Sequence, residues 1–206
     1  MTATLMSSDR PSSGAPISGA PISGRTPSLF RRVIPSPVGE LLLESDGVGL
    51  TAVRFLGAGV RTPTGDPDGT WTDDDAAASV LEAAVAQLGE YFDGVRTTFE
   101  IPVRSRGTDF QQAVWSALTA IPYGTTWTYR RLATELGRPT ATRAVGAACG
   151  RNPVAVVVPC HRVLGADGTL TGYAGGTAIK ADLLALEART LARDGATTGQ
   201  AVARLA

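Results

Sequence analysis

The chain has 206 residues, of which 43% are hydrophobic, 18% charged and 6% aromatic. This length and composition are typical of one large or two small globular domains, and they exclude a disulfide-stabilised peptide, a collagen-like chain and a wholly disordered protein. Nineteen basic residues balance nineteen acidic ones, so the net charge of zero does not by itself indicate a polyanionic partner.

The sequence predicts a soluble protein of the cytoplasm. No stretch approaches the roughly 18 apolar residues needed to cross a bilayer, and the N-terminus lacks a basic segment followed by an apolar run. The two cysteines, Cys149 and Cys160, are too few for a disulfide framework, and with His161 as the single histidine they cannot complete a structural zinc site. We therefore expect no metal, no cofactor, no membrane partner and a reducing compartment that keeps a working thiol.

Four regions are expected along the chain, and together they predict an α+β fold. Residues 1–28 are rich in Ser, Gly, Pro and Ala and contain a tandem Ser-Gly-Ala-Pro-Ile repeat, which predicts a disordered tail. Residues 29–103 predict a small N-terminal α/β domain with an antiparallel sheet. Residues 104–192 predict a mainly helical C-terminal domain, and residues 193–206 a short tail.

Short apolar runs separated by turn residues predict the sheet of the first domain. These runs are residues 32–34, 40–44 and 49–56. The Asp46-Gly47 pair between the last two runs is a strong hairpin signal. Residues 57–75 predict an exposed loop that ends in three aspartates, which suit a helix N-terminus. Apolar residues then recur at helical spacing over 80–92, and residues 97–103 are expected to return as another strand.

Helices dominate the prediction for the second domain. Thr108 and Gln111 form a capping box at the start of a helix that Pro122 ends. Two short helices follow, over residues 129–137 and 141–150, joined by a tight turn. Their lengths and separation are those of a helix-turn-helix, although other helical domains contain such pairs.

Charge is divided unevenly along the chain. Residues 66–100 contain nine acidic residues and one arginine, whereas residues 104–167 contain eight arginines and three acidic residues. The basic region coincides with the predicted helix-turn-helix, as binding to a phosphate backbone would require. Solvated surface arginines explain the same pattern equally well, so charge alone leaves both interpretations open.

The most informative stretch, residues 152–163, reads Asn-Pro-Val-Ala-Val-Val-Val-Pro-Cys-His-Arg-Val. Residues 154–158 predict a buried strand, which Pro159 ends. A thiol is only a few per cent ionised near neutral pH, and a neighbouring imidazole raises that fraction, so we expect Cys160 to be an activated nucleophile. Adjacent strand residues face opposite ways, so Cys160 and His161 must lie in a turn or communicate through a water.

Both residues of this pair also have an ordinary structural interpretation. An isolated Cys160 is more often a small buried hydrophobe, and His161 a surface residue that adjoins it. The Pro-Cys-His-Arg tetrapeptide after an apolar run favours the nucleophile instead. Cys149 lies among small residues of a predicted helix, so we expect it to contribute only to packing.

Several motifs follow one another in an order that is improbable by chance. They are Arg143-Ala144-Val145-Gly146, Asn152-Pro153, Pro159-Cys160-His161-Arg162-Val163, Tyr173-Ala174-Gly175-Gly176 and the helix that carries Glu187. Over about residues 30–190 the chain resembles the O6-alkylguanine-DNA alkyltransferases, also called methylated-DNA--protein-cysteine methyltransferases. The resemblance implies that residues 104–192 bind DNA and accept the alkyl group. It further implies that the alkyl group of O6-alkylguanine, and of O4-alkylthymine, in duplex DNA passes to Cys160 once per molecule.

The resemblance also assigns roles to five residues around the chemistry. Cys160 attacks the alkyl carbon, His161 removes the thiol proton through a bridging water, and Glu187 orients the imidazole. Asn152 ties the turn after the recognition helix to the active-site loop, and Tyr129 donates a proton to guanine N3. Without the resemblance, Glu187 reads as an exposed carboxylate, Asn152 as part of a helix stop, and Tyr129 as a half-buried core residue.

A minor-groove DNA interface with little sequence readout is implied as well. Arg143 would fill the space of the extruded nucleotide, on a helix face of small residues. The DNA-contacting set is Tyr129, Arg130, Ala141, Thr142, Arg143, Ala144 and Gly146, and the substrate pocket is formed by Val163 and the lid Tyr173, Ala174 and Gly175. Taken alone, that lid is a glycine-rich turn. Ala174 stands where several relatives have serine and Ala155 where some have proline, which bears on the tolerance for bulky alkyl groups.

Two other functions remain open at this point. One is a Cys-His hydrolase or peptidase that turns over, and the other is a protein that binds alkylated bases without repairing them. The arginine-bearing helix pair and the lack of an obvious oxyanion-hole segment disfavour the first, and Cys160 disfavours the second. The sequence does not determine the preferred alkyl group, cooperative assembly along DNA or the purpose of residues 1–28.

Overall fold

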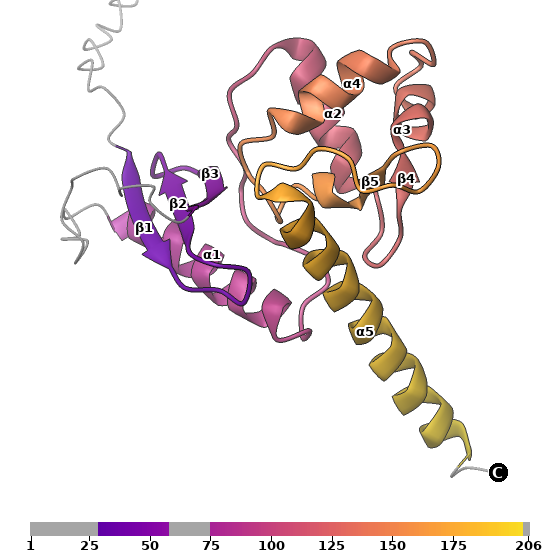
Figure 1. Ribbon diagram of the computed structural model, residues 1–206. Helices are drawn as coiled ribbons and strands as arrows, with labels where there is room; N and C mark the ends of the chain where they lie inside the picture. The colour runs from indigo at the N-terminus through magenta and orange to yellow at the C-terminus, as the bar shows by residue number, and fades with distance from the viewer. Residues whose placement is uncertain (1–28, 58–74, 204–206) are drawn as a thin grey trace, which may run out of the picture.

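The computed structural model describes the backbone of residues 29–57 and 75–203, and the side chains of residues 29–57 and 78–195. The tail expected over residues 1–28 and nearly all of the loop expected over 57–75 lie outside this described part. The described residues form a small sheet-and-helix unit followed by a helical unit (Figure 1). The predicted α+β class is therefore confirmed.

Three antiparallel strands make the N-terminal sheet, in the order β1-β2-β3. They are β1 (Phe30–Ile34), β2 (Leu41–Ser45) and β3 (Leu50–Phe55). The predicted hairpin lies between β2 and β3, where Asp46 Oδ1 accepts the backbone N–H groups of Val48 and Gly49 at 3.1 and 3.0 Å. Gly47 adopts a φ of 84° in this turn, a conformation that favours glycine.

Helix α1 (Asp75–Phe92) packs against this sheet (Figure 1). Its buried apolar residues, spaced three or four apart, face the core as the periodicity predicts. They are Leu81, Ala84, Leu88 and Tyr91. Because α1 ends directly after Tyr91, the tyrosine lies at the end of the helix that leads toward the second unit.

The strand expected over residues 97–103 is wrong. The structure has an extended connection there, in which Val103 forms one isolated bridge with Leu50. Leu50 donates its N–H to Pro102 O at 2.7 Å, and Arg104 donates to Leu50 O at 2.9 Å. Pro102 has no N–H to donate, so the pairing does not propagate into a strand.

The second unit begins with three helices, α2 (Asp109–Thr119), α3 (Tyr129–Glu135) and α4 (Thr142–Gly150). Thr108 Oγ1 accepts the Gln111 N–H at 3.3 Å and Gln111 Oε1 accepts the Thr108 N–H at 2.9 Å, so the capping box is confirmed. Helices α3 and α4 are joined by a short turn and contact each other, which confirms the helix-turn-helix. Trp115 of α2 donates its indole N–H to Ala148 O at 2.9 Å and anchors α4.

A short parallel pair and a long helix complete the fold. Strand β4 (Trp127–Thr128) pairs with β5 (Val163–Leu164), and α5 (Gly176–Ala203) leads away from the other elements (Figure 1). Helix α5 continues into the residues expected as a C-terminal tail, as far as Ala203. Among the described residues, no helix is both long and apolar enough to span a bilayer.

Candidate active site

The segment that precedes Cys160 is a compact turn built around the side chain of Asn152. Asn152 Oδ1 accepts the Val154 N–H at 3.1 Å, and Nδ2 donates to Val158 O at 2.7 Å. Residues 154–158 are buried as predicted, but the strand expected there is wrong. Only Val154 pairs, in an isolated bridge with Val53. The Asn152 amide satisfies backbone groups that a neighbouring strand would otherwise pair with.

Backbone strain is concentrated in the middle of this turn. Val156 has a φ of 70°, in the left-handed region that a β-branched residue rarely adopts. Such a conformation costs on the order of 1–3 kcal/mol and persists only where surrounding contacts impose it. Here the side chain is fully buried, and the Val158 N–H closes the turn on Val154 O at 2.9 Å. The segment is therefore held in one shape directly before the cysteine.

Cys160 and His161 lie in a single 3-10 turn, η1 (Cys160–Arg162). This confirms the expectation that the pair lies in a turn and not on a strand. The Cys160 side chain is almost completely buried, and Asn152 Nδ2 donates a hydrogen bond to its Sγ at 3.2 Å. The Asn152 backbone N–H donates to Cys149 O at 3.1 Å, so Asn152 joins the end of α4 to the sulfur.

Both members of the pair are neutral at rest. Burial raises the pKa of the Cys160 thiol, although the hydrogen bond from Asn152 and the charge of Lys180 oppose that rise. Burial also lowers the pKa of His161, against the opposing influence of Glu187. The resting state is therefore a thiol beside a neutral imidazole. This differs from the expected rise in thiolate fraction, because the buried site does not solvate a thiolate.

Glu187, on α5, is the centre of a fully buried polar cluster. Its Oε1 lies 2.9 Å from His161 Nε2, and Arg162 donates Nε to both carboxylate oxygens at 3.1 Å and a terminal nitrogen to Oε1 at 3.0 Å. The Gly124 backbone N–H donates to Oε2 at 2.8 Å. Burial by itself would raise the pKa of Glu187, but His161 and Arg162 outweigh it and lower the pKa to about 2.

This cluster determines which imidazole nitrogen carries the proton. An ionised carboxylate only accepts hydrogen bonds, so His161 Nε2 must be the protonated nitrogen that donates to Glu187. In the neutral ring, Nδ1 is then the unprotonated acceptor. This Nδ1 is buried and has no hydrogen-bond partner among the described residues, so it is free to accept a proton.

Two buried residues of the site were not identified from the sequence. Tyr91 of α1 donates its hydroxyl to Glu187 Oε1 at 2.9 Å. Lys180 of α5 donates Nζ to Val163 O at 2.6 Å and to Thr171 O at 2.9 Å. Lys180 is the sole lysine of the chain, a signal that was available in the sequence. Tyr91 follows the same three- or four-residue spacing as the apolar residues of α1, so the sequence indicates only that it packs in the core.

A groove of about 530 Å³ opens beside the helix-turn-helix. It brings together residues of α3, α4 and the loop before α5, namely Tyr129, Thr142, Arg143, Gly146, Gly150, Thr171, Gly172, Tyr173 and Ala174. Burial raises the pKa of both Tyr129 and Tyr173, and a nearby Cys160 contributes to each rise. Cys160 therefore lies near enough to both tyrosines to influence their ionisation.

Some of the expected site residues do not line this groove. Val163 is fully buried in β5, and Gly175 lies against Phe55, where a Cβ atom would come within 2.8 Å of the ring. Arg130, Ala141 and Ala144 lie on the helix-turn-helix but are not among the groove's lining residues, and Arg130 and Ala144 are exposed. The groove thus contains Tyr129, Thr142, Arg143 and Gly146 of the expected DNA-contacting set and Tyr173 and Ala174 of the expected lid.

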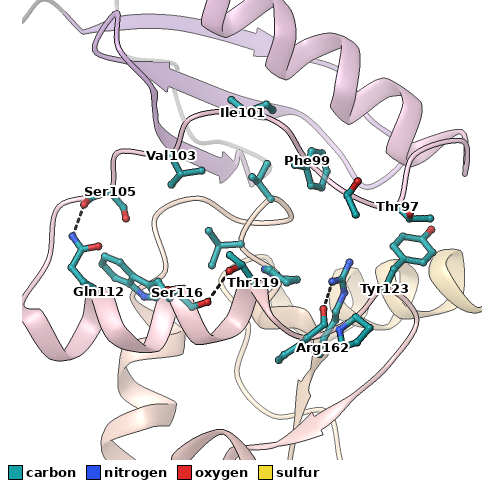
Figure 2. A pocket seen from close by; sticks show the side chains of 17 residues that line it. Thr97, Phe99, Ile101, Val103, Ser105, Gln112, Ser116, Thr119, Tyr123 and Arg162 are labelled. Carbon is teal, nitrogen blue, oxygen red and sulfur yellow. Dashed lines mark hydrogen bonds between the residues drawn. The ribbon is translucent and has the colours of Figure 1, made fainter. Parts of the chain in front are cut away.

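A second cavity, of about 460 Å³, lies behind the active-site turn. Figure 2 shows it between the extended 97–105 segment and α2, with Phe99, Ile101 and Val103 facing Gln112, Ser116 and Thr119. Val157, Val158 and Pro159 of the turn also line it, as does Arg162. None of the residues expected to contact DNA or the alkyl group borders this cavity.

Comparison with known proteins agrees with this geometry. A family model described as "6-O-methylguanine DNA methyltransferase, ribonuclease-like domain" matches residues 29–105, and "6-O-methylguanine DNA methyltransferase, DNA binding domain" matches residues 109–189. A methylated-DNA--protein-cysteine methyltransferase of Mycobacterium tuberculosis is 50% identical over 157 residues, which are 76% of this chain and 90% of that protein. One of Methanosarcina barkeri is 42% identical over 163 residues, 79% of this chain and 99% of that protein.

Solved structures agree as well. A crystal structure of the Mycobacterium tuberculosis O6-methylguanine methyltransferase is 48% identical, with a TM-score of 0.66 and coverage of 79% of this chain and 94% of that one. A crystal structure of Mycobacterium tuberculosis OGT in complex with DNA is 47% identical, with a TM-score of 0.67 and coverage of 78% and 93%.

The chain therefore belongs to the 6-O-methylguanine DNA methyltransferase family, the O6-alkylguanine-DNA alkyltransferases. Its enzyme class is that of a methylated-DNA--protein-cysteine methyltransferase, which acts in DNA repair. In the part of the chain that the structure describes, no three His, Cys, Asp or Glu side chains are grouped so that they could hold a metal ion.

Proposed function

We propose that the chain repairs duplex DNA by moving the alkyl group of O6-alkylguanine to Cys160, once per molecule. The sulfur–carbon bond forms as the bond between the alkyl carbon and O6 breaks. A thioether has no good leaving group, so Cys160 stays alkylated. The observation that carries this proposal is a buried thiol, hydrogen-bonded by Asn152, beside an imidazole that Glu187 orients.

The proton of the thiol leaves through His161. Nδ1 is the free acceptor of the ring, and a bridging water would connect it to Sγ, while Nε2–H remains bonded to Glu187. The charged imidazolium is then stabilised by the carboxylate. Burial disfavours both the thiolate and the imidazolium at rest, so the proton moves from sulfur to His161 in the course of the reaction.

Tyr129 would balance the charge on the leaving guanine. It lines the groove, and its hydroxyl, which donates to Thr171 O at 3.4 Å, would donate instead to guanine N3 as the C–O6 bond breaks. The proton from the thiol afterwards replaces the proton that Tyr129 donated. The net result is the transfer of one proton from sulfur to guanine. The same displacement on O4-alkylthymine needs no further residue, so we include that base among the substrates.

The groove beside the helix-turn-helix would receive the extruded nucleotide. Arg143 is exposed at its edge and would replace that nucleotide in the duplex, with α4 in the minor groove. Extrusion costs a few kcal/mol, which stacking between Tyr129 and Tyr173 and hydrogen bonds in the groove would offset. The DNA minor groove gives little sequence information, so the lesion would be selected largely by the protein groove beside the helix-turn-helix.

A reducing, cytoplasmic setting suits a reaction that needs a free thiol.

Intact mass tests this function directly. The protein is incubated with a severalfold excess of duplex DNA containing O6-methylguanine, and we expect the mass of only one methylene to be added, mapped to Cys160, with one lesion repaired per protein molecule. Cys160→Ala should show no addition, and Cys149→Ala, the matched control at the other buried thiol, should react like the unsubstituted protein. Multiple turnovers would indicate a hydrolase. Binding without a change of mass would indicate a protein that binds alkylated bases without repairing them. Methylation of Cys149 would show that Cys160 is not the nucleophile.

A further inference from the structure

One hydroxyl of the N-terminal unit reaches the buried carboxylate of the reaction centre. Tyr91 lies in α1, within the segment matched by the ribonuclease-like family model, whereas Cys160, His161 and Glu187 lie within the segment matched by the DNA-binding model. Tyr91 is fully buried, and its hydroxyl donates to Glu187 Oε1 at 2.9 Å. That same oxygen accepts His161 Nε2–H at 2.9 Å, and the Tyr91 oxygen lies 3.5 Å from Nε2.

Packing alone does not require this hydroxyl. Aromatic rings surround the Tyr91 ring, with centroids at 5.4 Å for Phe92, 5.5 Å for Phe99 and 5.9 Å for Tyr123. A phenylalanine would fill the same cage without burying a polar group. Burial and the carboxylate of Glu187 both raise the pKa of Tyr91, so the phenol stays protonated and remains a donor.

We propose that Tyr91 is a positioning residue of the alkyl-transfer site, through which the N-terminal unit sets the orientation and basicity of the Glu187–His161 pair. The inference rests on the proposed role of His161 as the base. Tyr91 touches neither the alkyl group nor the sulfur, and it acts through Glu187 Oε1.

The hydroxyl has two effects on that oxygen. It shares the charge of Oε1 with His161 and Arg162, which weakens the pull of the carboxylate on the imidazole proton. It also fixes the direction from which His161 can donate, because Arg162 and Gly124 occupy the other sides of the carboxylate. Removing the hydroxyl leaves more charge for His161, which favours the imidazolium, and leaves the ring less firmly oriented.

Several charged or titratable groups lie around His161. They are Glu187 and Lys180 on α5, Arg162 and Cys160 on η1, Tyr91 on α1 and Tyr173 in the loop before α5, whose ring centroid lies 6.3 Å from that of the imidazole. Tyr91→Phe changes one of these groups and leaves the others in place. A change in the titration of His161 in this variant therefore reports the hydroxyl.

The test combines nuclear magnetic resonance with kinetics on the untagged full chain. His161 is the sole histidine, so its imidazole signals need no assignment. We expect Tyr91→Phe to raise the midpoint of His161 titration by roughly half a pH unit or more, because the carboxylate charge that the hydroxyl shared then acts on the imidazolium. The acid limb of the single-turnover rate should move in the same direction, and the plateau rate should fall roughly tenfold.

Tyr123→Phe is the matched control. Tyr123 also lies beside Tyr91, but among the described residues its hydroxyl forms no hydrogen bond to Glu187, so its removal should move neither the titration nor the acid limb. An unshifted His161 titration in a folded Tyr91→Phe variant, or equal shifts in both variants, would overturn the inference. Because the titration is read without any alkylated DNA, an unreactive unsubstituted protein would count against the proposed function and leave the inference to be decided by the spectra.

Discussion

Replacement of Glu187 by glutamine tests the buried polar cluster most directly. The substitution keeps the size of the side chain but removes the charge opposite Arg162, whose side chain is 7% exposed. Removing one partner of a buried ion pair costs about 3–5 kcal/mol, because the other charge stays buried without compensation. We expect the free energy of unfolding at pH 7 to fall by that amount.

The pH dependence of stability gives an independent magnitude. Glu187 has its pKa lowered from an ordinary value of 4.5 to about 2, which corresponds to roughly 3 kcal/mol. Between these values the unfolded chain binds the proton and the folded chain does not, so this contribution is complete above pH 4.5 and is lost as the pH falls toward 2. The contribution of His161, whose pKa is lowered, is lost in a higher window, as the pH falls below 6.5.

Urea unfolding at a series of pH values from 7 to 2.5 measures both effects. Glu187→Gln should lack the loss of stability below pH 4.5, so that its curve converges on that of the unsubstituted protein in acid. The matched control is Glu135→Gln on α3, where a half-exposed carboxylate lies 4.0 Å from Arg131 and should contribute less than about 1 kcal/mol. Parallel curves for Glu187→Gln and the unsubstituted protein would refute this account of the cluster.

Three further predictions follow from the site. Asn152→Ala removes the donor to Sγ and leaves Val154 N–H and Val158 O without their partner. We expect the free energy of unfolding in urea to fall by about 1–3 kcal/mol and the single-turnover rate to fall at least roughly tenfold. An unchanged rate would exclude the Sγ contact from the reaction. Arg143→Ala should slow repair of duplex substrate more than reaction with a free O6-alkylguanine base, because only the duplex requires extrusion, and equal losses would contradict its role. Alkylation of Cys160 adds a methyl group to a tightly packed site, which costs about 1–3 kcal/mol of stability. Calorimetry before and after the reaction should therefore show a Tm several degrees lower for the alkylated protein. An unchanged Tm would show that there is spare room around the sulfur.

Most of the chemistry-bearing residues could be found in the sequence because they lie in short motifs. Cys160 and His161 are adjacent, and the Asn-Pro pair eight residues before the cysteine marks the turn that holds the sulfur. Local signals also predicted the capping box of α2 and the hairpin between β2 and β3, because such features depend on residues three or four positions apart.

Local composition failed where a specific side chain or a tertiary neighbour satisfies the backbone. Residues 154–158 have the composition of a buried strand, yet the side chain of Asn152 replaces the strand partner and the chain turns instead. Residues 97–103 alternate like a strand, but Pro102 and a single bridge to Leu50 limit the pairing to one position. In both cases the competing hydrogen bond comes from a specific side chain or a specific neighbour, which composition does not reveal.

The amino-acid order is sufficient to identify the family, the proposed nucleophile and the helix-turn-helix, since each depends on contiguous residues whose chemistry is recognisable locally. Protonation states and partners depend on burial and on contacts between distant segments. Tyr91 meets a carboxylate 96 positions later in the chain, and a thiol that looks activated beside its imidazole is kept neutral by exclusion of water. Folding brings these groups within hydrogen-bond distance and removes their solvent, and neither event leaves a trace in local sequence.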